Sequence, residues 1–277
     1  MNSMSGATAS SLWPRIITSI ILIPSALAAV YAGGWVLAVW AGAAGFAMAR
    51  EWTRIVHRDA RFGWRFALHG LAIVSSQILL VAGEPNLAIA SILFAAFIGS
   101  LIAQRREERS VWLIAGIIFV AAPCLAFASL RATVPFGFET VVWLLSVVWA
   151  TDSAAFLAGS AVGGPKLAPL ISPNKTWAGA AAGLVAGIFA GFILAQLAGQ
   201  YVSLAFMAAS AALAVLTQCG DLAESFLKRR FGVKDASDLI PGHGGALDRL
   251  DGMIFATSGL ALFVICTGFS PVIWAMR

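Results

Sequence analysis

Long apolar stretches recur along the whole chain and limit what it can fold into more than any other feature. Of its 277 residues, 60% are hydrophobic and only 11% are charged. A soluble domain carries roughly 25% charged residues, and no stretch here is polar enough to form a water-facing domain on a single anchor. The sequence therefore excludes a soluble or a disordered protein and predicts a chain that crosses a membrane many times.

Nine apolar runs are candidate membrane spans. We predict helices rather than barrel strands, because the runs are continuous and a helix satisfies its own backbone hydrogen bonds in lipid. The expected fold is therefore an all-α, polytopic integral membrane protein with about nine transmembrane helices in a single membrane-embedded domain, residues 1–277. The predicted spans are residues 16–32, 35–49, 66–82, 87–103, 111–130, 141–159, 178–198, 202–220 and 253–275.

The basic residues indicate the orientation, because cytoplasmic loops hold most of the Lys and Arg. With a cytoplasmic N-terminus, all but Arg131 and Arg277 of the 18 basic residues fall on the cytoplasmic side. The net charge of +5 then reports topology rather than a nucleic-acid partner. A cleaved signal peptide is the alternative for the first run, but the leader carries only one basic residue, Arg15. We expect an uncleaved first span and a cytoplasmic N-terminus.

Acidic residues are rare and concentrate near the C-terminal end. Helical spacing puts Asp221, Glu224 and Lys228 on one polar face, and Asp248 and Asp251 on another. Carboxylates this close repel each other unless a cation intervenes, and Mg²⁺ takes such oxygen ligands together with phosphates. For the first group alone, the alternative is a helix whose polar end simply emerges from the membrane into the cytosol. Together the two groups predict metal-dependent phosphoryl chemistry.

Two loops on the same predicted side carry groups that bind phosphate. In the turn at 241–245, glycines expose backbone N–H groups that can approach an anion. The loop 163–177 precedes the seventh span and contributes Lys166, Ser172, Asn174, Lys175 and Thr176. Asp152 lies inside the sixth run, where an ionised carboxylate is costly unless it is paired or hydrated. We predict that Asp152 completes the metal site or orients a lysine, with a structural hydrogen bond between helices as the alternative.

These residues also resemble a family signature. The segment 225–251 is similar to the signature of phosphatidate cytidylyltransferases, also called CDP-diacylglycerol synthases. Its matching parts are Ser225-Phe226-Leu227-Lys228-Arg229, Lys234-Asp235, Pro241-Gly242-His243-Gly244-Gly245 and Asp248-Arg249-Leu250-Asp251. Residues 166–169 and 172–177 resemble a second family motif, and Glu51-Trp52 resembles a weaker one. Ala246 replaces a larger aliphatic residue, and Ala178 stands where an acid is common, so we assign no carboxylate role there.

The resemblance implies an enzyme that converts CTP and phosphatidic acid to CDP-diacylglycerol and pyrophosphate, with one or two Mg²⁺ ions. It implies a catalytic domain with its signature at 221–252, an active site at the cytoplasmic face of the bacterial inner membrane, and is compatible with a homodimer. The expected catalytic residues are Asp221, Asp248, Asp251 and Lys228; the three aspartates are also the expected metal ligands, with Asp152 as a further candidate. The expected substrate-binding residues are Lys166, Ser172, Asn174, Lys175, Thr176, Ser225, Arg229, Lys234, His243, Gly244, Gly245 and Arg249.

Other classes of membrane protein remain as alternatives. A polytopic transporter would use an intramembrane acid such as Asp152, but the charges gather at the predicted cytoplasmic surface and no inverted repeat is visible. A CDP-alcohol phosphotransferase would need further spaced aspartates after Asp251-Gly252, where apolar residues follow instead. A purely structural protein has no use for this arrangement of acids and glycines. Formation of CDP-lipid and pyrophosphate from labelled CTP would separate these classes.

Overall fold

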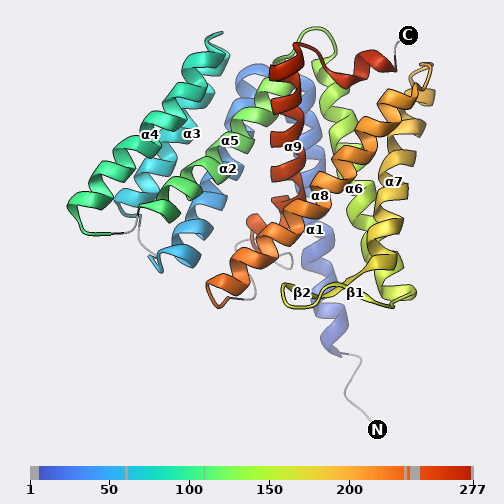
Figure 1. Ribbon diagram of the computed structural model, residues 1–277, viewed down its shortest axis with the longest axis horizontal. Coiled ribbons are helices and arrows are strands. Elements are labelled where there is room, and N and C mark those ends of the chain that lie inside the picture. The colour runs from blue at the N-terminus through green and yellow to red at the C-terminus, as the bar shows by residue number, and fades with distance from the viewer. Residues whose placement is uncertain (1–5, 60–61, 109, 234–235, 238–243, 276–277) are drawn as a thin grey trace. The chain divides into compact units, whose positions relative to one another are not determined.

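The computed structural model describes residues 6–59, 62–108, 110–233, 236–237 and 244–275 (Figure 1). Within these ranges the chain is helical apart from one two-stranded sheet, which confirms the expected all-α membrane fold. The helices are α1 Gly6–Ala32, α2 Gly34–Val56, α3 Trp64–Val81, α4 Pro85–Arg105, α5 Val111–Ala132, α6 Gly137–Ala161, α7 Trp177–Leu197, α8 Leu204–Arg230 and α9 Leu247–Thr267. A short 3₁₀ helix, Pro271–Trp274, follows α9.

Seven helices, α3 to α9, are long and apolar enough to cross a membrane, judged by length and composition among the described residues. Their outward side chains are apolar, as in Leu93, Phe94 and Phe97 of α4, which are all more than half exposed. Apolar side chains exposed in this number suit a lipid environment. The chain is therefore an integral membrane protein, while nine crossings and a cytoplasmic N-terminus stay predictions.

Several helices extend beyond the apolar runs that predicted them, and α1 begins ten residues earlier, at Gly6. Helix α2 continues to Val56, α8 continues to Arg230, and α9 begins at Leu247. In α8 the extension is amphipathic, and its Lys228 Nζ lies 2.7 Å from Glu224 Oε2, one turn away. The hydropathy pattern marks where apolar surface ends, whereas the helix ends where its backbone amides and carbonyls find other partners.

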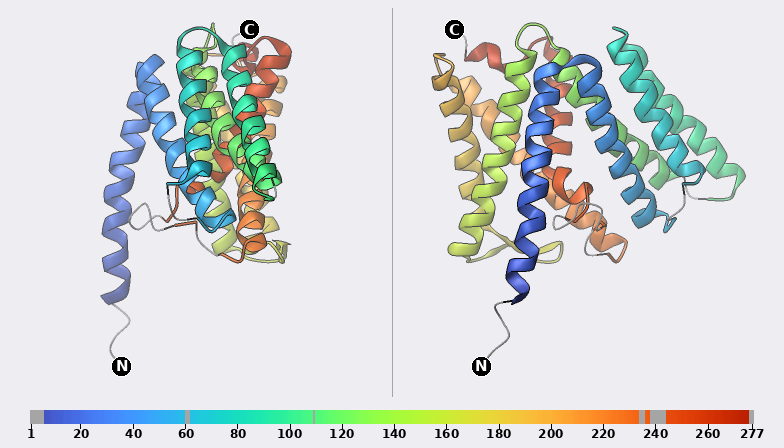
Figure 2. Two further views of the ribbon diagram at one scale, coloured as in Figure 1. Left: turned by 90° about the vertical axis from the view of Figure 1, so that its left-hand side faces the viewer. Right: turned by 180° about the vertical axis from the view of Figure 1, so that it is seen from behind.

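The helices pack as two compact units. Unit 1 comprises Met1–Ala128 and Phe231–Arg249, and unit 2 comprises Ser129–Arg230 and Leu250–Arg277. In unit 1, α3 and α4 lie side by side in both figures (Figures 1 and 2). The expectation of a single catalytic domain over residues 1–277 stays a prediction.

In unit 2, α6 and α7 pack along their whole lengths (Figure 2). Helix α7 presents a row of glycines, one per turn, to its neighbours: Gly179, Gly183, Gly187 and Gly191 are all buried. A methyl group on Gly183 would lie 2.9 Å from the Thr151 carbonyl oxygen of α6, so the row has no room for larger residues. Small residues allow the backbones of membrane helices to approach closely. Such close van der Waals packing stabilises the pair, since the hydrophobic effect does not drive helices together within lipid.

The loop predicted between α6 and α7 contains a β-hairpin. Strand β1, Lys166–Ala168, pairs antiparallel with β2, Ser172–Thr176, so that Lys166 lies opposite Thr176. The chain leaves α6 through Gly163 and Gly164, whose positive φ angles of 66° and 91° suit glycine. Thr176 then caps α7, because its Oγ1 accepts a hydrogen bond of 3.1 Å from the Gly179 amide. The hairpin therefore holds Lys175 at a defined position before α7.

Candidate active site

Unit 2 gathers charged side chains from four elements into one group, which we call the acidic cluster. Its central contact is the ion pair between Lys175 Nζ of β2 and Asp221 Oδ2 of α8, at 2.5 Å. The Asp251 carboxyl of α9 lies within hydrogen-bonding reach of Asp221. Asp152 of α6 interacts electrostatically with both Asp221 and Lys175. The members of the cluster are Asp152, Lys175, Asp221, Glu224, Lys228 and Asp251.

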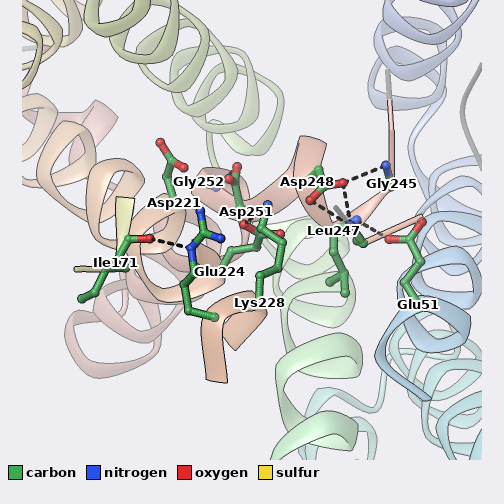
Figure 3. Close-up of polar contacts among 12 residues, drawn as sticks. Glu51, Ile171, Asp221, Glu224, Lys228, Gly245, Leu247, Asp248, Asp251 and Gly252 are labelled. Carbon is green, nitrogen blue, oxygen red and sulfur yellow. Dashed lines mark hydrogen bonds and ion pairs between the residues drawn. The ribbon is translucent and has the colours of Figure 1, made fainter. Parts of the chain in front are cut away.

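A second ion pair lies one turn further along α8. Glu224 is only 2% exposed, and its Oε2 lies 2.7 Å from Lys228 Nζ (Figure 3). Glu224 also acts electrostatically on Asp251. The polar face predicted for α8 therefore exists, and its Glu224 is buried against Lys228 while Asp221 stays partly exposed.

Two glycines bring the acids of α8 and α9 together. A methyl group on Gly220 would collide with the main-chain carbonyl of Asp251, and one on Gly252 would lie 2.7 Å from the Thr217 side chain. The two backbones therefore touch where these glycines lie. Because Asp221 follows Gly220 and Asp251 precedes Gly252, this crossing determines the approach of the two carboxyls.

The hairpin is tied to α8 by a further contact. Arg229 Nε donates a hydrogen bond of 3.4 Å to the Ile171 carbonyl, in the turn between β1 and β2. With the Lys175–Asp221 ion pair, this gives the hairpin two polar attachments to α8. Lys175 is thus held beside the Asp221 carboxylate by the packed hairpin.

The charges of the acidic cluster do not balance. If every carboxyl were ionised, its four acids would exceed its two lysines by two negative charges. Buried carboxylates are costly unless paired, and Mg²⁺ is usually held by one or two carboxylates plus substrate phosphates. Among the residues that the structure describes, no three His, Cys, Asp or Glu side chains are grouped as a metal site by themselves. The adjacent Asp221 and Asp251 therefore offer two of the oxygen ligands that such a cation takes, and its other ligands would have to come from elsewhere.

Unit 1 contains a different carboxylate arrangement at the start of α9. Asp248 Oδ2 accepts hydrogen bonds from the Gly245 amide at 2.9 Å and the Ala236 amide at 3.1 Å. Glu51 of α2 accepts from the Ala246 amide at 2.8 Å and the Leu247 amide at 2.7 Å (Figure 3). We call this arrangement the backbone cap, since two carboxylates take the amides that begin a helix.

The predicted site residues have different surroundings. Asp152, Lys175, Asp221, Lys228 and Asp251 meet in the acidic cluster of unit 2, and Asp248 belongs to the backbone cap of unit 1. Thr176 is 3% exposed and caps α7, whereas Asn174 and Arg249 are exposed. Lys166 and Ser172 lie on the hairpin, Ser225 and Arg229 on α8, and Gly244 and Gly245 just before α9. Lys234 and His243 lie outside the described residues.

The sequence does not predict the contacts of two glutamates. It places Glu224 on a polar helix face without naming its ion-pair partner, and it places Glu51 only in a weak motif. The available signal for Glu51 was an acid two residues past the apolar run 35–49, followed at once by a tryptophan. The glycine turn also differs in detail, because in this conformation the Gly245 amide already binds a carboxylate of the chain. Phosphate binding by this turn stays a prediction.

Known proteins resemble this chain over nearly its full length. A family model described as the cytidylyltransferase family matches residues 13–267. A phosphatidate cytidylyltransferase of Brucella suis is 40% identical over 259 residues, which cover 92% of this chain and 93% of the relative. The phosphatidate cytidylyltransferase of Helicobacter pylori is 35% identical over 253 residues, 89% of each chain. That of Bacillus subtilis is 41% identical over 132 residues, 47% of this chain and 48% of its own. With a match of this extent, the chain belongs to the cytidylyltransferase family.

Proposed function

We propose that this protein transfers the cytidylyl group of CTP to phosphatidic acid, which yields CDP-diacylglycerol and pyrophosphate. The acidic cluster is the observation that carries this proposal, because it combines paired carboxylates with two lysines from separate elements. The choice of CTP and phosphatidic acid as substrates rests on the relatives named phosphatidate cytidylyltransferase, which match along most of the chain. They offer no support for a transporter.

The proposed reaction needs charge neutralisation more than a strong base. An oxygen of the lipid phosphate, already anionic, forms a bond to the α-phosphorus of CTP, and the bond from that phosphorus to the bridging oxygen of the leaving pyrophosphate breaks. Nucleophile, nucleotide and leaving group are all negative, so they repel each other. Lys175 and Lys228, each now paired with a carboxylate, are positioned to exchange that partner for a phosphate oxygen. The residues then hold both substrates in line.

The same proposal includes one or two Mg²⁺ ions. Asp221 and Asp251 would hold a cation, with Asp152 as a further ligand or as the group that orients Lys175. A bound cation supplies positive charge at the nucleotide phosphates. Asp248 is the remaining proposed ligand, although its Oδ2 accepts two backbone amides in this conformation. The predicted roles of Lys166, Ser172, Asn174, Ser225 and Arg229 in substrate binding belong to the proposal as well.

We further propose that the enzyme lies in the bacterial inner membrane with its active site on the cytoplasmic face. The basic residues of the predicted loops support this orientation. A reporter fused after Arg277 would lie outside the cytoplasm if the chain crosses the membrane nine times from a cytoplasmic N-terminus. A homodimer is the expected assembly, and its mass can be measured in detergent.

Purified protein in lipid, given labelled CTP, phosphatidic acid and Mg²⁺, tests the proposed function. We expect CDP-diacylglycerol and pyrophosphate in equal amounts, and neither product without phosphatidic acid or with a chelator. Asp248→Asn should abolish turnover while membrane insertion stays intact. Absence of both products from the unaltered protein would refute the proposal, and near-normal turnover of Asp248→Asn would refute its role as a metal ligand.

A further inference from the structure

Glu51 is a buried acid that the proposed chemistry does not use. It is 1% exposed and lies in the second half of α2. It accepts a hydrogen bond from the Ala246 amide, 195 positions further along the chain. Leaving a carboxylate in such a place is costly unless hydrogen bonds compensate it. Here Oε1 accepts from Ser237 Oγ at 2.5 Å and from the Ala246 amide, while Oε2 accepts from the Leu247 amide. Both oxygens are thus committed to the segment that begins α9.

The neighbouring Trp52 fixes the direction in which the Glu51 side chain leaves α2. Trp52 is 2% exposed, its Nε1 donates to the Trp112 carbonyl at 3.2 Å, and its ring lies 5.3 Å from that of Phe119. A methyl group on Gly116 of α5 would overlap the Trp52 indole, so the indole has a closely fitted place against α5. Because Trp52 fixes the rotation of α2, the adjacent Glu51 is fixed as well.

Glu51 and Asp248 share three consecutive amides. Asp248 takes that of Gly245, and Glu51 takes those of Ala246 and Leu247. A methyl group on Gly245 would lie 2.8 Å from Glu51 Oε2 and 3.0 Å from Asp248 Oδ2, so only glycine leaves room for both carboxylates. The positive end of α9 and its unpaired first amides favour the negative charge of both acids. Without Glu51, the Ala246 and Leu247 amides just before Asp248 would lose the carboxylate to which they donate.

We propose that Glu51 is a positioning residue for cytidylyl transfer: its carboxylate holds the first turn of α9 so that Asp248 keeps one orientation. This inference rests on the proposed function, in which Asp248 takes part. Glu51 itself touches no substrate and acts only through the amides of residues 246–247 and the Ser237 hydroxyl. Misplacing a reacting group by about 1 Å can lower turnover on the order of 10²-fold.

The test compares Glu51→Gln with the unaltered full-length protein in lipid. Glutamine keeps the size of the side chain but presents an N–H₂ group to one of the amide donors. We expect hydrogen exchange of the 244–250 amides to rise by about tenfold or more, while the α6 and α7 amides are unchanged. We also expect kcat to fall on the order of 10²-fold, the Mg²⁺ concentration for half-maximal rate to rise, and KM for phosphatidic acid to stay constant. Glu84→Gln, the same change at an exposed acid before α4, should retain the original values.

A second variant covers the case in which Glu51→Gln does not fold. Ser237→Ala removes one of the three donors and keeps the carboxylate, so it should give the same changes at smaller size. Altered heat stability with an unaltered kcat and Mg²⁺ requirement would overturn the positioning role, as would unaltered exchange at 244–250. An unaltered protein that makes no CDP-lipid would instead refute the proposed function, and the exchange measurement would still report on the contact.

Discussion

The backbone cap of unit 1 and the acidic cluster of unit 2 both contain carboxylates, but the partners of those carboxylates differ. In the backbone cap, the Glu51 carboxylate is saturated by three donors, two of them main-chain amides. In the acidic cluster, Asp221 is opposed by a lysine and crowded by another carboxyl, that of Asp251. A main-chain donor cannot leave without unwinding a helix, whereas a lysine can turn to a phosphate. The comparison separates acids held by main-chain donors from acids whose lysine partners can be exchanged for a phosphate.

The largest expected effect tests the acidic cluster side of this comparison. Asp221→Asn removes a charge that repels Asp251 but also the ion-pair partner of Lys175, and these effects on stability oppose each other. We therefore expect heat stability to change little while turnover falls on the order of 10³-fold. CDP-diacylglycerol synthesis and thermal unfolding in detergent measure the two quantities. Glu139→Gln, at an exposed acid in the first turn of α6, serves as the control in the same unit. Unaltered turnover, or a loss of stability with proportional loss of activity, would erase the distinction between the two regions.

A smaller effect is expected at the helix crossing that builds the acidic cluster. Gly220→Ala places a methyl group against the main-chain carbonyl of Asp251, so α8 and α9 must separate. Overpacking of this kind costs about 1–3 kcal/mol, and thermal unfolding should register it together with a lower turnover. In Gly42→Ala, by contrast, the nearest atom is 3.7 Å from the new methyl group, which is ordinary contact. Equal stability of the two variants would mean that close backbone approach does not hold the carboxyls together.

The smallest expected effect concerns His57, which follows α2 in unit 1 and lies outside the membrane-spanning helices. Burial, followed by the charges of Arg65 and His69, lowers the pKa of His57 from 6.5 to about 4, against the weaker opposing effects of Glu108 and Asp59. Below pH 6.5 the unfolded chain binds a proton that the folded chain refuses. Its contribution to stability is therefore complete above pH 6.5 and is lost as the pH falls toward 4.

Thermal unfolding between pH 7.5 and pH 4 measures this loss. His57→Gln cannot take up the proton, so its unfolding temperature should fall less with acidification than that of the unaltered protein. A contribution of this sign would show that protonation of His57 affects the stability of the fold. The same pH dependence in both proteins would contradict the lowered pKa.

Much of the helical fold follows from local sequence properties. Continuous apolar runs predicted the helices, because a segment in lipid must satisfy its own backbone hydrogen bonds. The helix ends were less accessible, since the extension of α8 to Arg230 depends on a polar face turned toward other acids. The β-hairpin was missed because its pairing of Lys166 with Thr176 is set by main-chain hydrogen bonds in a segment rich in proline and glycine.

The candidate site was predictable in composition but not in grouping. Spacing along one helix put Asp248 and Asp251 together, yet their partners differ completely: amides for Asp248 and a carboxyl for Asp251. Contacts between elements distant in sequence are not encoded in any local period, and Lys175 with Asp221 is an example. Glu51 shows the same limit, because its donors lie nearly 200 residues away.

The sequence by itself determined that this protein is a bundle of membrane helices, which residues carry its chemistry, and to which family it is similar. These properties depend on side-chain type and short spacing, and both can be read along the chain. The tertiary structure decided which carboxylates are bound by main-chain amides and which by lysines. That choice depends on backbones that approach only where Gly220, Gly245 and Gly252 leave room, so it exists only once the helices have packed.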